Sequence, residues 1–510
     1  MYFSTYSNFD SHPEALGVRM LRYINRPQAI TKKRQWLAQL SGMGDRCSTD
    51  LADDPDDPRI SKQRPQIDFT IEWIYEIDLD RNIFHINGIP FFSLEYLPDP
   101  YAFIRHISKD HYGNVACAPA CHPGHKYEKP VPPSVHDSDL ATYQSLACTG
   151  AHMDLSDLLA ISDALTPGEH VRVSLLETMI GQCMIRSDTA SLIYGLGLVS
   201  SHDQLTDDEW LTACTMANFA FVPQMFGTHI SHPQLNRKEF TWVREDTVVC
   251  ISTHLDDEGC LQASISRLID AILEEKDNPG DYFGVAFSVY HCAIVKVVKD
   301  VHITTFSHTT PFKFLPSFYA DSPSTPGITA IARLGNRVDQ ALFVRIAEIY
   351  QTSEDNWHTY QQKSLPQGID DTLPKISCKE LPTELWREVA LHLQSSDLIA
   401  FGLVSDLCRE AATMVLRYPH VCGYRLVAVA KERPQCLLHS GEYRFLHNAC
   451  FSAAQAGIPV DVLVGSESQN NIISRIKGDT HGIMKRLSAE DLARMDSQCG
   501  PCSSSLGLLV

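Results

Sequence analysis

Residues 381–412 read LPTELWREVALHLQSSDLIAFGLVSDLCREAA, and this stretch decides how the chain is interpreted. Pro382 suits the first turn of a helix whose apolar residues recur at i, i+4 and i+8, namely Leu385, Val389 and Leu393. Ser395 and Ser396 can cap a second helix, and Ser405 can cap a third. The second helix carries the apolar residues Leu398, Phe401 and Val404. The sequence therefore predicts three short amphipathic helices in a row.

Three helices of this length cannot bury all of their apolar side chains against one another. Leu381, Pro382 and Trp386 lie off the stripe that Leu385, Val389 and Leu393 form on the first helix. Together with residues of the second helix they are expected to leave an apolar patch on the surface. A patch of this kind indicates a binding partner.

The same stretch resembles the F-box, and the likeness spans residues 379–420. The family pattern of Leu-Pro, Glu-Leu, an aliphatic residue, Leu, Asp-Leu and Val-Ser falls in order on Leu381-Pro382, Glu384-Leu385, Val389, Leu393, Asp397-Leu398 and Val404-Ser405. One position departs from the pattern, because Cys408 precedes Arg409 where the family usually has Trp. Since Cys is a small buried residue, we expect weaker packing of the third helix. The alternative is a helical segment that fits the pattern by chance.

F-box segments dock on the Skp adaptor of cullin–RING ubiquitin ligases, so the resemblance implies a docking role and no chemistry. The adaptor-binding residues that it implies are Leu381, Pro382, Leu385, Trp386, Val389, Leu393, Leu398, Phe401 and Val404. Apolar anchors supply most of the affinity when helices associate through a groove. The resemblance also implies that residues 1–352 select the protein to be ubiquitylated, with an adaptor, a cullin scaffold and that protein as partners.

Outward from this stretch, the sequence predicts an α+β protein in several parts. The predicted parts are an α+β region at 1–352, a polar linker at 353–378, the F-box at 379–420, a helical C-terminal extension at 421–475 and a flexible tail at 476–510. Apolar and polar residues alternate over 69–94, and the Asn87-Gly88 dipeptide suits a tight turn, so this segment predicts an antiparallel β-meander. The further elements that the pattern predicts are helices at 167–184, 259–275 and 328–352 and strands at 240–254, 282–298 and 301–307.

Composition argues against several classes of function. The chain has 43 Lys and Arg residues against 62 Asp and Glu residues, which gives a net charge of −19. Phosphate binding depends on clustered basic residues, so nucleic acid is disfavoured as a partner. The sequence shows neither a secretory leader nor an apolar run long enough to span a membrane, and no membrane association is expected. The 16 cysteines are then expected to be thiols in the cytoplasm or the nucleus.

Three weaker motifs have more ordinary interpretations. The soft ligands Cys117, Cys121, His122 and His125 could bind zinc, but their spacing differs from that of paired knuckles, so a polar loop is the favoured interpretation. The C-G-P-C sequence at 499–502 lacks the strand and helix that a redox dithiol needs. His254, Asp256 and Asp257 follow a predicted strand, where they cap the next helix more readily than they form an acid–base pair. Because nucleotide-binding and hydrolase motifs are also lacking, we expect neither a cofactor nor catalysis.

The leading hypothesis is therefore a non-enzymatic substrate receptor that docks through the F-box-like stretch. A second hypothesis makes residues 1–352 an enzyme or a small-ligand domain, whose turnover or location the F-box controls. A pocket with convergent titratable groups would favour this second hypothesis, whereas an open apolar or charged surface would favour the receptor. A third possibility is a scaffold outside any ligase. Residues 5–17 and 314–330 resemble only stretches of uncharacterised fungal proteins, which implies no function.

Overall fold

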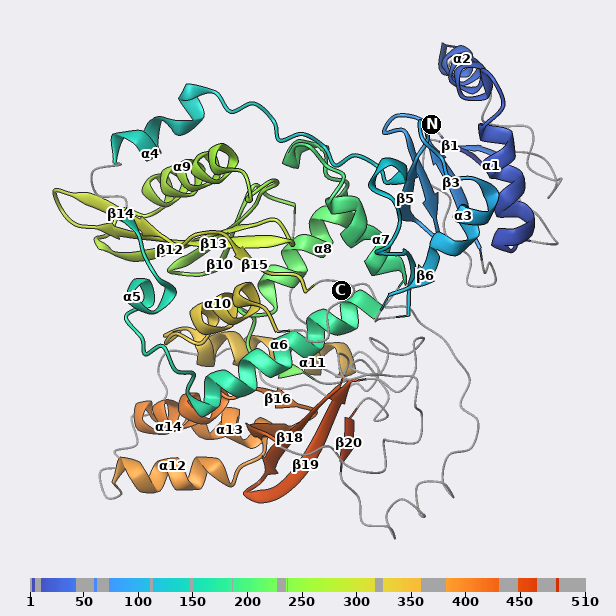
Figure 1. The fold of residues 1–510 in the computed structure, drawn as a ribbon. Helices are drawn as coiled ribbons and strands as arrows, with labels where there is room; N and C mark the ends of the chain where they lie inside the picture. Colours follow the sequence, from blue (N-terminus) through green and yellow to red (C-terminus); the bar gives the residue numbers. More distant parts are fainter. Residues whose placement is uncertain are drawn as a thin grey trace, which may run out of the picture. The chain divides into compact units, whose positions relative to one another are not determined.

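The computed structural model describes residues 2–4, 11–42, 59–61, 73–110, 113–146, 151–185, 187–226, 235, 237–316, 324–358, 382–430, 448–465 and 483–485 (Figure 1). The chain belongs to the predicted α+β class. It divides into unit 1, which comprises Met1–Pro130 and Ser187–Leu198, and unit 2, which comprises Val131–Arg186 and Val199–Val510. The predicted boundaries differ from this division, because residues 1–352 contribute to both units and the F-box-like stretch belongs to unit 2.

The predicted β-meander is confirmed in unit 1. Its antiparallel strands are β3 (Tyr75–Asp78), β4 (Ile83–Ile86) and β5 (Ile89–Ser93), in that order in the sheet. Asn87 and Gly88 form the second turn, with φ values of 51° and 76°. Positive φ at both positions is what a tight hairpin requires, and an Asn-Gly pair adopts it at low cost.

Helices and short strands complete unit 1. The helices are α1 (Val18–Ile24), α2 (Ala29–Gly42), α3 (Pro100–His106) and α7 (Ser187–Leu196). Strand β1 (Tyr2–Ser4) pairs antiparallel with β2 (Arg59–Ser61), and β6 (Ile107–Lys109) pairs antiparallel with β7 (Val115–Cys117). The core of the unit is aromatic, and its fully buried rings include Phe84, Phe91, Phe92 and Phe103. These rings pack at centroid separations of 5.6–5.9 Å, within the range that favours aromatic pairs.

Unit 2 contains a mixed sheet in the order β10-β11-β12-β13-β14-β8, with β15 paired to β13. The strands are β8 (Ala151–His152), β10 (Phe240–Arg244), β11 (Thr247–Ile251), β12 (Gly280–Phe287), β13 (His291–Lys299), β14 (Thr304–His308) and β15 (Phe312–Lys313). The predicted helix after residue 258 is α9 (Glu258–Glu275), which links the parallel strands β11 and β12. Its apolar face packs on the sheet through residues that include Leu261, Ile265 and Leu268.

Further helices of unit 2 are α4 (Ala141–Ser145), α5 (Leu155–Leu159), α6 (Pro167–Ile185), α8 (Asp207–Asn218), α10 (Pro326–Gly335) and α11 (Leu342–His358). Helix α6 matches the predicted helix at 167–184. The single helix predicted at 328–352 is two helices, α10 and α11, and α11 extends to His358 into the predicted linker. Residues 359–378 of that linker lie outside the described residues.

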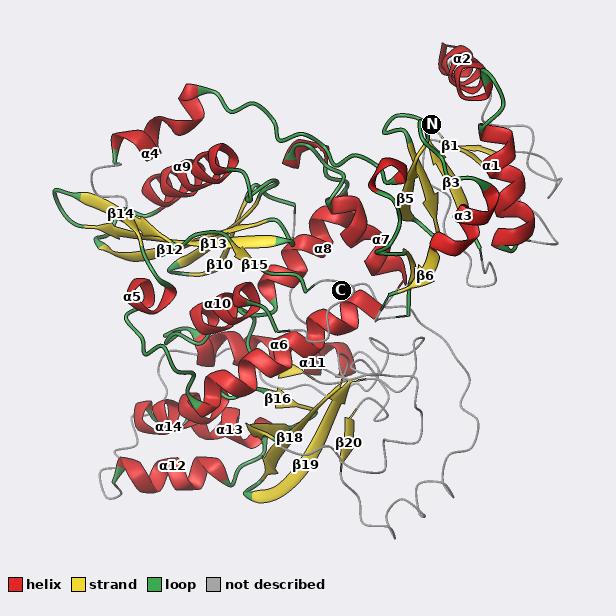
Figure 2. Cartoon of the chain, in the orientation of Figure 1, coloured by secondary structure: helices red, strands yellow, loops and turns green. Residues whose placement is uncertain are grey.

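A second sheet of unit 2 has the order β20-β19-β18-β17-β16-β9. Figure 2 labels four of its strands, β16, β18, β19 and β20. Its strands are β9 (Met225–Phe226), β16 (His420–Val421), β17 (Tyr424–Val429), β18 (Asn448–Gln455), β19 (Ile458–Gly465) and β20 (Ile483–Lys485). The prediction of a helical extension at 421–475 is therefore wrong, because the described residues of this region form strands that cover one side of α6. Apart from β20, residues 476–510, including the C-G-P-C sequence, lie outside the described residues.

Candidate functional site

The three predicted helices are present at the F-box-like stretch. They are α12 (Thr383–Leu391), α13 (Ser395–Gly402) and α14 (Asp406–Leu416), here called the three-helix segment. Pro382 precedes α12, where its fixed φ suits a helix start. The Ser405 hydroxyl caps α14, as predicted, by accepting a hydrogen bond from the Cys408 amide at 3.2 Å. Ser395 is the buried first residue of α13, and its side chain does not act as the cap.

The inner side of the three-helix segment packs on α11 of the same chain. Leu398 is 1% exposed, and it shares a core with Phe343 and Ile346 of α11. The partly buried members of this core from the segment are Trp386, Leu391, Leu393, Ile399, Phe401 and Leu403. Gly402 permits this contact, because a Cβ at that position would overlap the Phe343 ring. The segment is thus built around a helix that lies outside the motif.

This packing involves four of the residues predicted to contact an adaptor. Leu398 is buried in the core shared with α11, and Trp386, Leu393 and Phe401 are partly buried against it. The Trp386 ring lies 5.8 Å from the Phe401 ring, measured between centroids. These four residues therefore contribute to packing within the chain, and Leu381 lies outside the described residues.

Other apolar residues of the segment are exposed. Leu385, Val389 and Val404 are 48%, 42% and 44% exposed, and Leu407 is also exposed. Pro382 is exposed as predicted. The Leu385–Val389 stripe therefore faces solvent and Trp386 faces the core, which reverses the expected orientation of α12. Exposed aliphatic side chains on one small segment are candidates for contacts with another protein.

Helix α14 packs through small residues. Cys408, at the position where the F-box pattern has Trp, is 1% exposed. Ala411 and Ala412, on the following turn, are fully buried. The core position at which the F-box pattern has a large ring is therefore filled by a small buried side chain in this chain.

A strand pair attaches the three-helix segment to an early part of the chain. Strand β16, directly after α14, runs parallel to β9. The His420 amide donates to the Gln224 carbonyl at 2.7 Å, and the Cys422 amide donates to the Phe226 carbonyl at 2.6 Å. Sequence analysis missed this pairing, because a two-residue strand carries no periodicity to detect.

A second attachment lies at the C-terminal end of α10, where arginine side chains satisfy backbone carbonyls. Arg172 of α6 donates to the Gly335 carbonyl at 2.7 Å and to the Ala220 carbonyl at 3.0 Å. Burial lowers the pKa of Arg172 to about 9. Arg417, which follows α14, donates to the Asn336 carbonyl at 3.0 Å. Arg417 thereby ties the end of the three-helix segment to α10.

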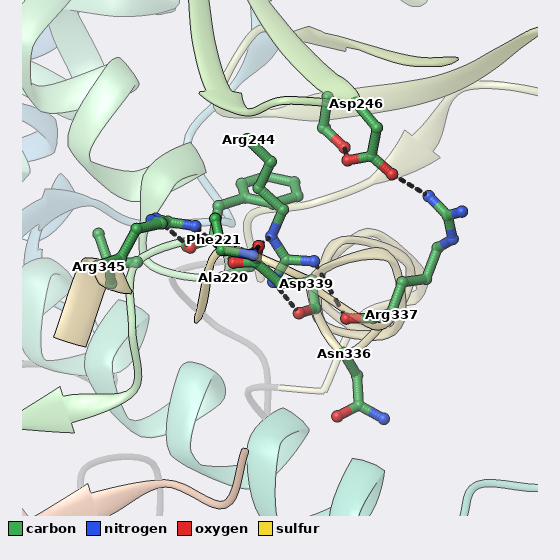
Figure 3. Close-up of polar contacts among 12 residues, drawn as sticks. Ala220, Phe221, Arg244, Asp246, Asn336, Arg337, Asp339 and Arg345 are labelled. Carbon is green, nitrogen blue, oxygen red and sulfur yellow. Dashed lines mark hydrogen bonds and ion pairs between the residues drawn. The ribbon is translucent and has the colours of Figure 1, made fainter. Parts of the chain in front are cut away.

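Figure 3 shows the neighbouring part of this arginine cluster. Arg345 binds the Asp339 carboxylate at 2.8 Å and the Phe221 carbonyl at 2.9 Å. Arg244 donates to the Arg337 carbonyl at 3.2 Å, and burial lowers its pKa to about 10. Because these guanidinium groups bind the protein's own carbonyls and carboxylates, the cluster holds elements of unit 2 together.

The predicted zinc candidates do not converge on one point. The His122 Nδ1 atom accepts a hydrogen bond from the Gly124 amide at 3.1 Å, and the His125 Nδ1 atom lies 2.6 Å from the Tyr96 carbonyl. The Cys121 side chain is buried, and burial raises the pKa of the Cys117 thiol to about 12. Across the described ranges, no three His, Cys, Asp or Glu side chains are placed to hold a metal ion. The arrangement agrees with a hydrogen-bonded loop.

The His254, Asp256 and Asp257 group has a structural role. Asp257 caps α9 by accepting a hydrogen bond from the Cys260 amide at 3.0 Å. His254 adopts a φ of 51°, and its Nε2 atom lies 3.2 Å from the Val199 carbonyl. This geometry is that of a strand end followed by a capped helix, which is the favoured prediction.

Unit 2 has a small hollow among its described residues. It has a volume of about 150 Å³, and its lining includes His202, Asp203, Arg237 and Glu239. The titratable groups pair with one another or with nearby residues: His202 with Asp203 at 3.1 Å, Arg267 with Glu239 at 2.6 Å, and Arg237 with Asp207. Ligand pockets usually measure roughly 300–1,000 Å³. The hollow therefore gives the enzyme hypothesis little support.

Comparison of the chain with family models, curated proteins and solved structures returned no match. Among the described helices, none has both the length and the apolar character needed to cross a bilayer.

Proposed function

We propose that the chain is an F-box-type substrate receptor that links a target protein to a Skp–cullin–RING ubiquitin ligase. One observation carries the proposal: a three-helix segment with the F-box order of residues exposes Leu385, Val389 and Val404 to solvent. Such a receptor acts in the cytoplasm or the nucleus, as an adaptor-bound subunit without catalysis of its own.

The exposed aliphatic residues define a narrower docking surface than the motif alone implies. Burying one Leu or Val side chain contributes roughly 1.5–3 kcal/mol. Leu385, Val389, Val404 and Leu407 could therefore anchor a helix-in-groove contact of micromolar or tighter affinity. Pro382 adds an exposed apolar group at the start of α12.

Attachment to α11 and β9 suits a receptor. A ligase must hold its target at a defined place relative to the adaptor. A three-helix segment that is packed into unit 2 fixes the orientation of unit 2 relative to the adaptor better than a segment on a flexible linker would. The contacts of Phe343 with Gly402 and of Arg417 with Asn336 supply that integration.

The decisive test is the Leu385→Asp/Val389→Asp variant, assayed for co-purification with a Skp-type adaptor. Both side chains are exposed, so the fold should persist, whereas a buried carboxylate in the interface should reduce adaptor binding at least a hundredfold. Trp386 is unsuitable for this test because it packs, partly buried, against the core shared with α11.

The matched control is Val338→Asp/Val344→Asp, which adds the same charge at two exposed aliphatic residues outside the three-helix segment. This control should bind the adaptor as the parent chain does. If the parent chain fails to bind any Skp-type adaptor, or if the Leu385 and Val389 variant binds normally, the proposal is wrong.

A further inference from the structure

The small hollow of unit 2 combines apolar side chains with charged groups of both signs. Its apolar lining consists of three side chains that are each at most 5% exposed: Leu205, Trp210 and Ile251. The rest of the lining is titratable: His202, Asp203, Arg237, Lys238 and Glu239. A cavity of about 150 Å³ holds a molecule of the size of benzene. The hollow is thus too small for most enzyme substrates but has the size of one small ligand.

Two consecutive residues of opposite charge line this hollow. Lys238 and Glu239 lie just before β10, and the chain bends at Glu239. An extended backbone would direct neighbouring side chains to opposite sides, whereas here both side chains border the same hollow. An ammonium group and a carboxylate are therefore presented to a ligand from adjacent positions.

Both of these groups retain capacity to bind a ligand. The Lys238 side chain is exposed, and within the described residues it makes no hydrogen bond or ion pair. Glu239 uses one oxygen, Oε1, for both of its bonds to Arg267, at 2.6 Å and 3.1 Å. Its Oε2 atom has no hydrogen-bond donor in the described part of the chain. A ligand thus meets one cation and one carboxylate oxygen that the protein does not use.

The other charged groups of the lining already have partners. Arg237 donates to the Leu205 carbonyl at 2.9 Å and pairs with Asp207. The His202 Nε2 atom lies 3.1 Å from an oxygen of Asp203, whose side chain is 80% exposed and therefore well solvated. These groups shape the hollow, and the unused binding capacity lies at Lys238 and Glu239.

We propose that the hollow binds a free α-amino acid with a small apolar side chain. The ammonium and the carboxylate of such a molecule are attached to one carbon, which matches a carboxylate oxygen and a cation on consecutive residues. Charge-assisted hydrogen bonds to Glu239 and Lys238 hold these two groups. The side chain packs against Leu205, Trp210 and Ile251. The volume suits valine or leucine and excludes tryptophan.

The pair of charges separates this ligand from others of similar size. A carboxylic acid without an amine would place like charges together at Glu239, and an amine without a carboxylate would do so at Lys238. A peptide terminus carries only one of the two charges next to its side chain, and an internal residue carries neither. Because no residue of the three-helix segment lines the hollow, the inference does not rest on adaptor docking.

The test is calorimetric titration of the full chain with L-leucine, for which we expect a Kd of about 1 mM or tighter. Lys238→Gln and Glu239→Gln should each weaken leucine binding about fivefold. Lys238→Gln should not weaken binding of leucinamide, which lacks the carboxylate. Glu239→Gln should not weaken binding of N-acetyl-leucine, which lacks the ammonium. Both substituted side chains are exposed, so the fold should persist, and thermal unfolding checks this.

The matched controls are Lys313→Gln and Glu274→Gln, which remove the same charges from exposed residues outside the hollow and should retain the parent affinity. The inference is wrong if leucine does not bind at about 10 mM, tenfold above the expected limit. Equal affinities for leucine, leucinamide and N-acetyl-leucine, or equal losses in the control variants, would also contradict it. Tighter binding of a peptide that ends in leucine would assign the hollow to a chain terminus instead.

Discussion

The β-meander of unit 1 and the sheet of unit 2 that contains β16 are assembled from different kinds of contact. In unit 1, strands β3, β4 and β5 follow one another directly, so each pairs with its neighbour in sequence. In unit 2, the sheet that begins with β16 is completed by β9, which precedes it by a long stretch of chain. The first sheet depends on local turns. The second depends on the pairing of β16, which follows the three-helix segment, with β9. The F-box-like stretch is therefore part of unit 2 and not a module added to it.

The largest effect should follow from removing the ring that joins α11 to the three-helix segment. Phe343 is 4% exposed and contacts Gly402, so Phe343→Ala should lower the free energy of unfolding by about 3–5 kcal/mol. Urea unfolding measures the loss, and hydrogen exchange should locate it in unit 2. Val344→Ala, at the adjacent exposed position, should cost less than about 0.5 kcal/mol. Similar losses in the two variants would mean that α11 is not a core element.

A smaller effect should follow from the acid titration of His420 in β16. Burial lowers the pKa of His420 from 6.5 to about 4, and the Arg425 charge adds to the shift. Between these values the unfolded chain binds a proton that the folded chain does not, so stability falls as the pH decreases from 6.5 towards 4. His420 should account for at most about 2 kcal/mol of the loss between pH 7 and pH 5.

Urea unfolding at pH 7 and pH 5 tests this contribution. His420→Gln should show a smaller decrease in stability than the parent chain, whereas His302→Gln, at an exposed loop, should match the parent chain. An unchanged decrease in His420→Gln would show that β16 does not hold a neutral imidazole.

The smallest effect should come from the local turn of unit 1. Gly88 has a φ of 76°, so Gly88→Ala should destabilise the meander by about 1 kcal/mol. Hydrogen exchange should increase in the peptides of β4 and β5 and remain unchanged in unit 2. Gly168→Ala is the control, because a Cβ there meets the Tyr418 ring at an ordinary 3.8 Å. Faster exchange throughout the chain would show that the local sheet does not unfold on its own.

Sequence analysis succeeded where the determinants are local. The Asn87-Gly88 turn, the helix that Pro167 begins and the amphipathic face of α9 are each encoded within a few residues, and all three are present. The Ser405 cap of α14 belongs to the same category. Periodicity, turn chemistry and capping preferences suffice for such elements.

Sequence patterns did not predict the features that depend on a partner distant in the chain. Helix α12 has apolar residues on two sides, and its sequence does not show that α11 covers Trp386 and leaves Leu385 exposed. The C-terminal strands were predicted as helix, although residues 460–464 read VDVLV, an alternation that indicates a strand. The arginine cluster was missed because Arg172 and Arg417 become neighbours of α10 only in the folded chain.

The pairing of β9 with β16 has a consequence for the chain as it is made. Met225 and Phe226 leave the ribosome roughly 200 residues before their partner strand, which at about 5–20 residues per second is a delay of roughly 10–40 seconds. The apolar face of α6 that the later strands cover, including Val171 and Leu175, is synthesised earlier still. During this interval the nascent chain exposes an unpaired strand and an uncovered helix, which are features that chaperones bind, so translation speed and chaperone supply should govern its yield.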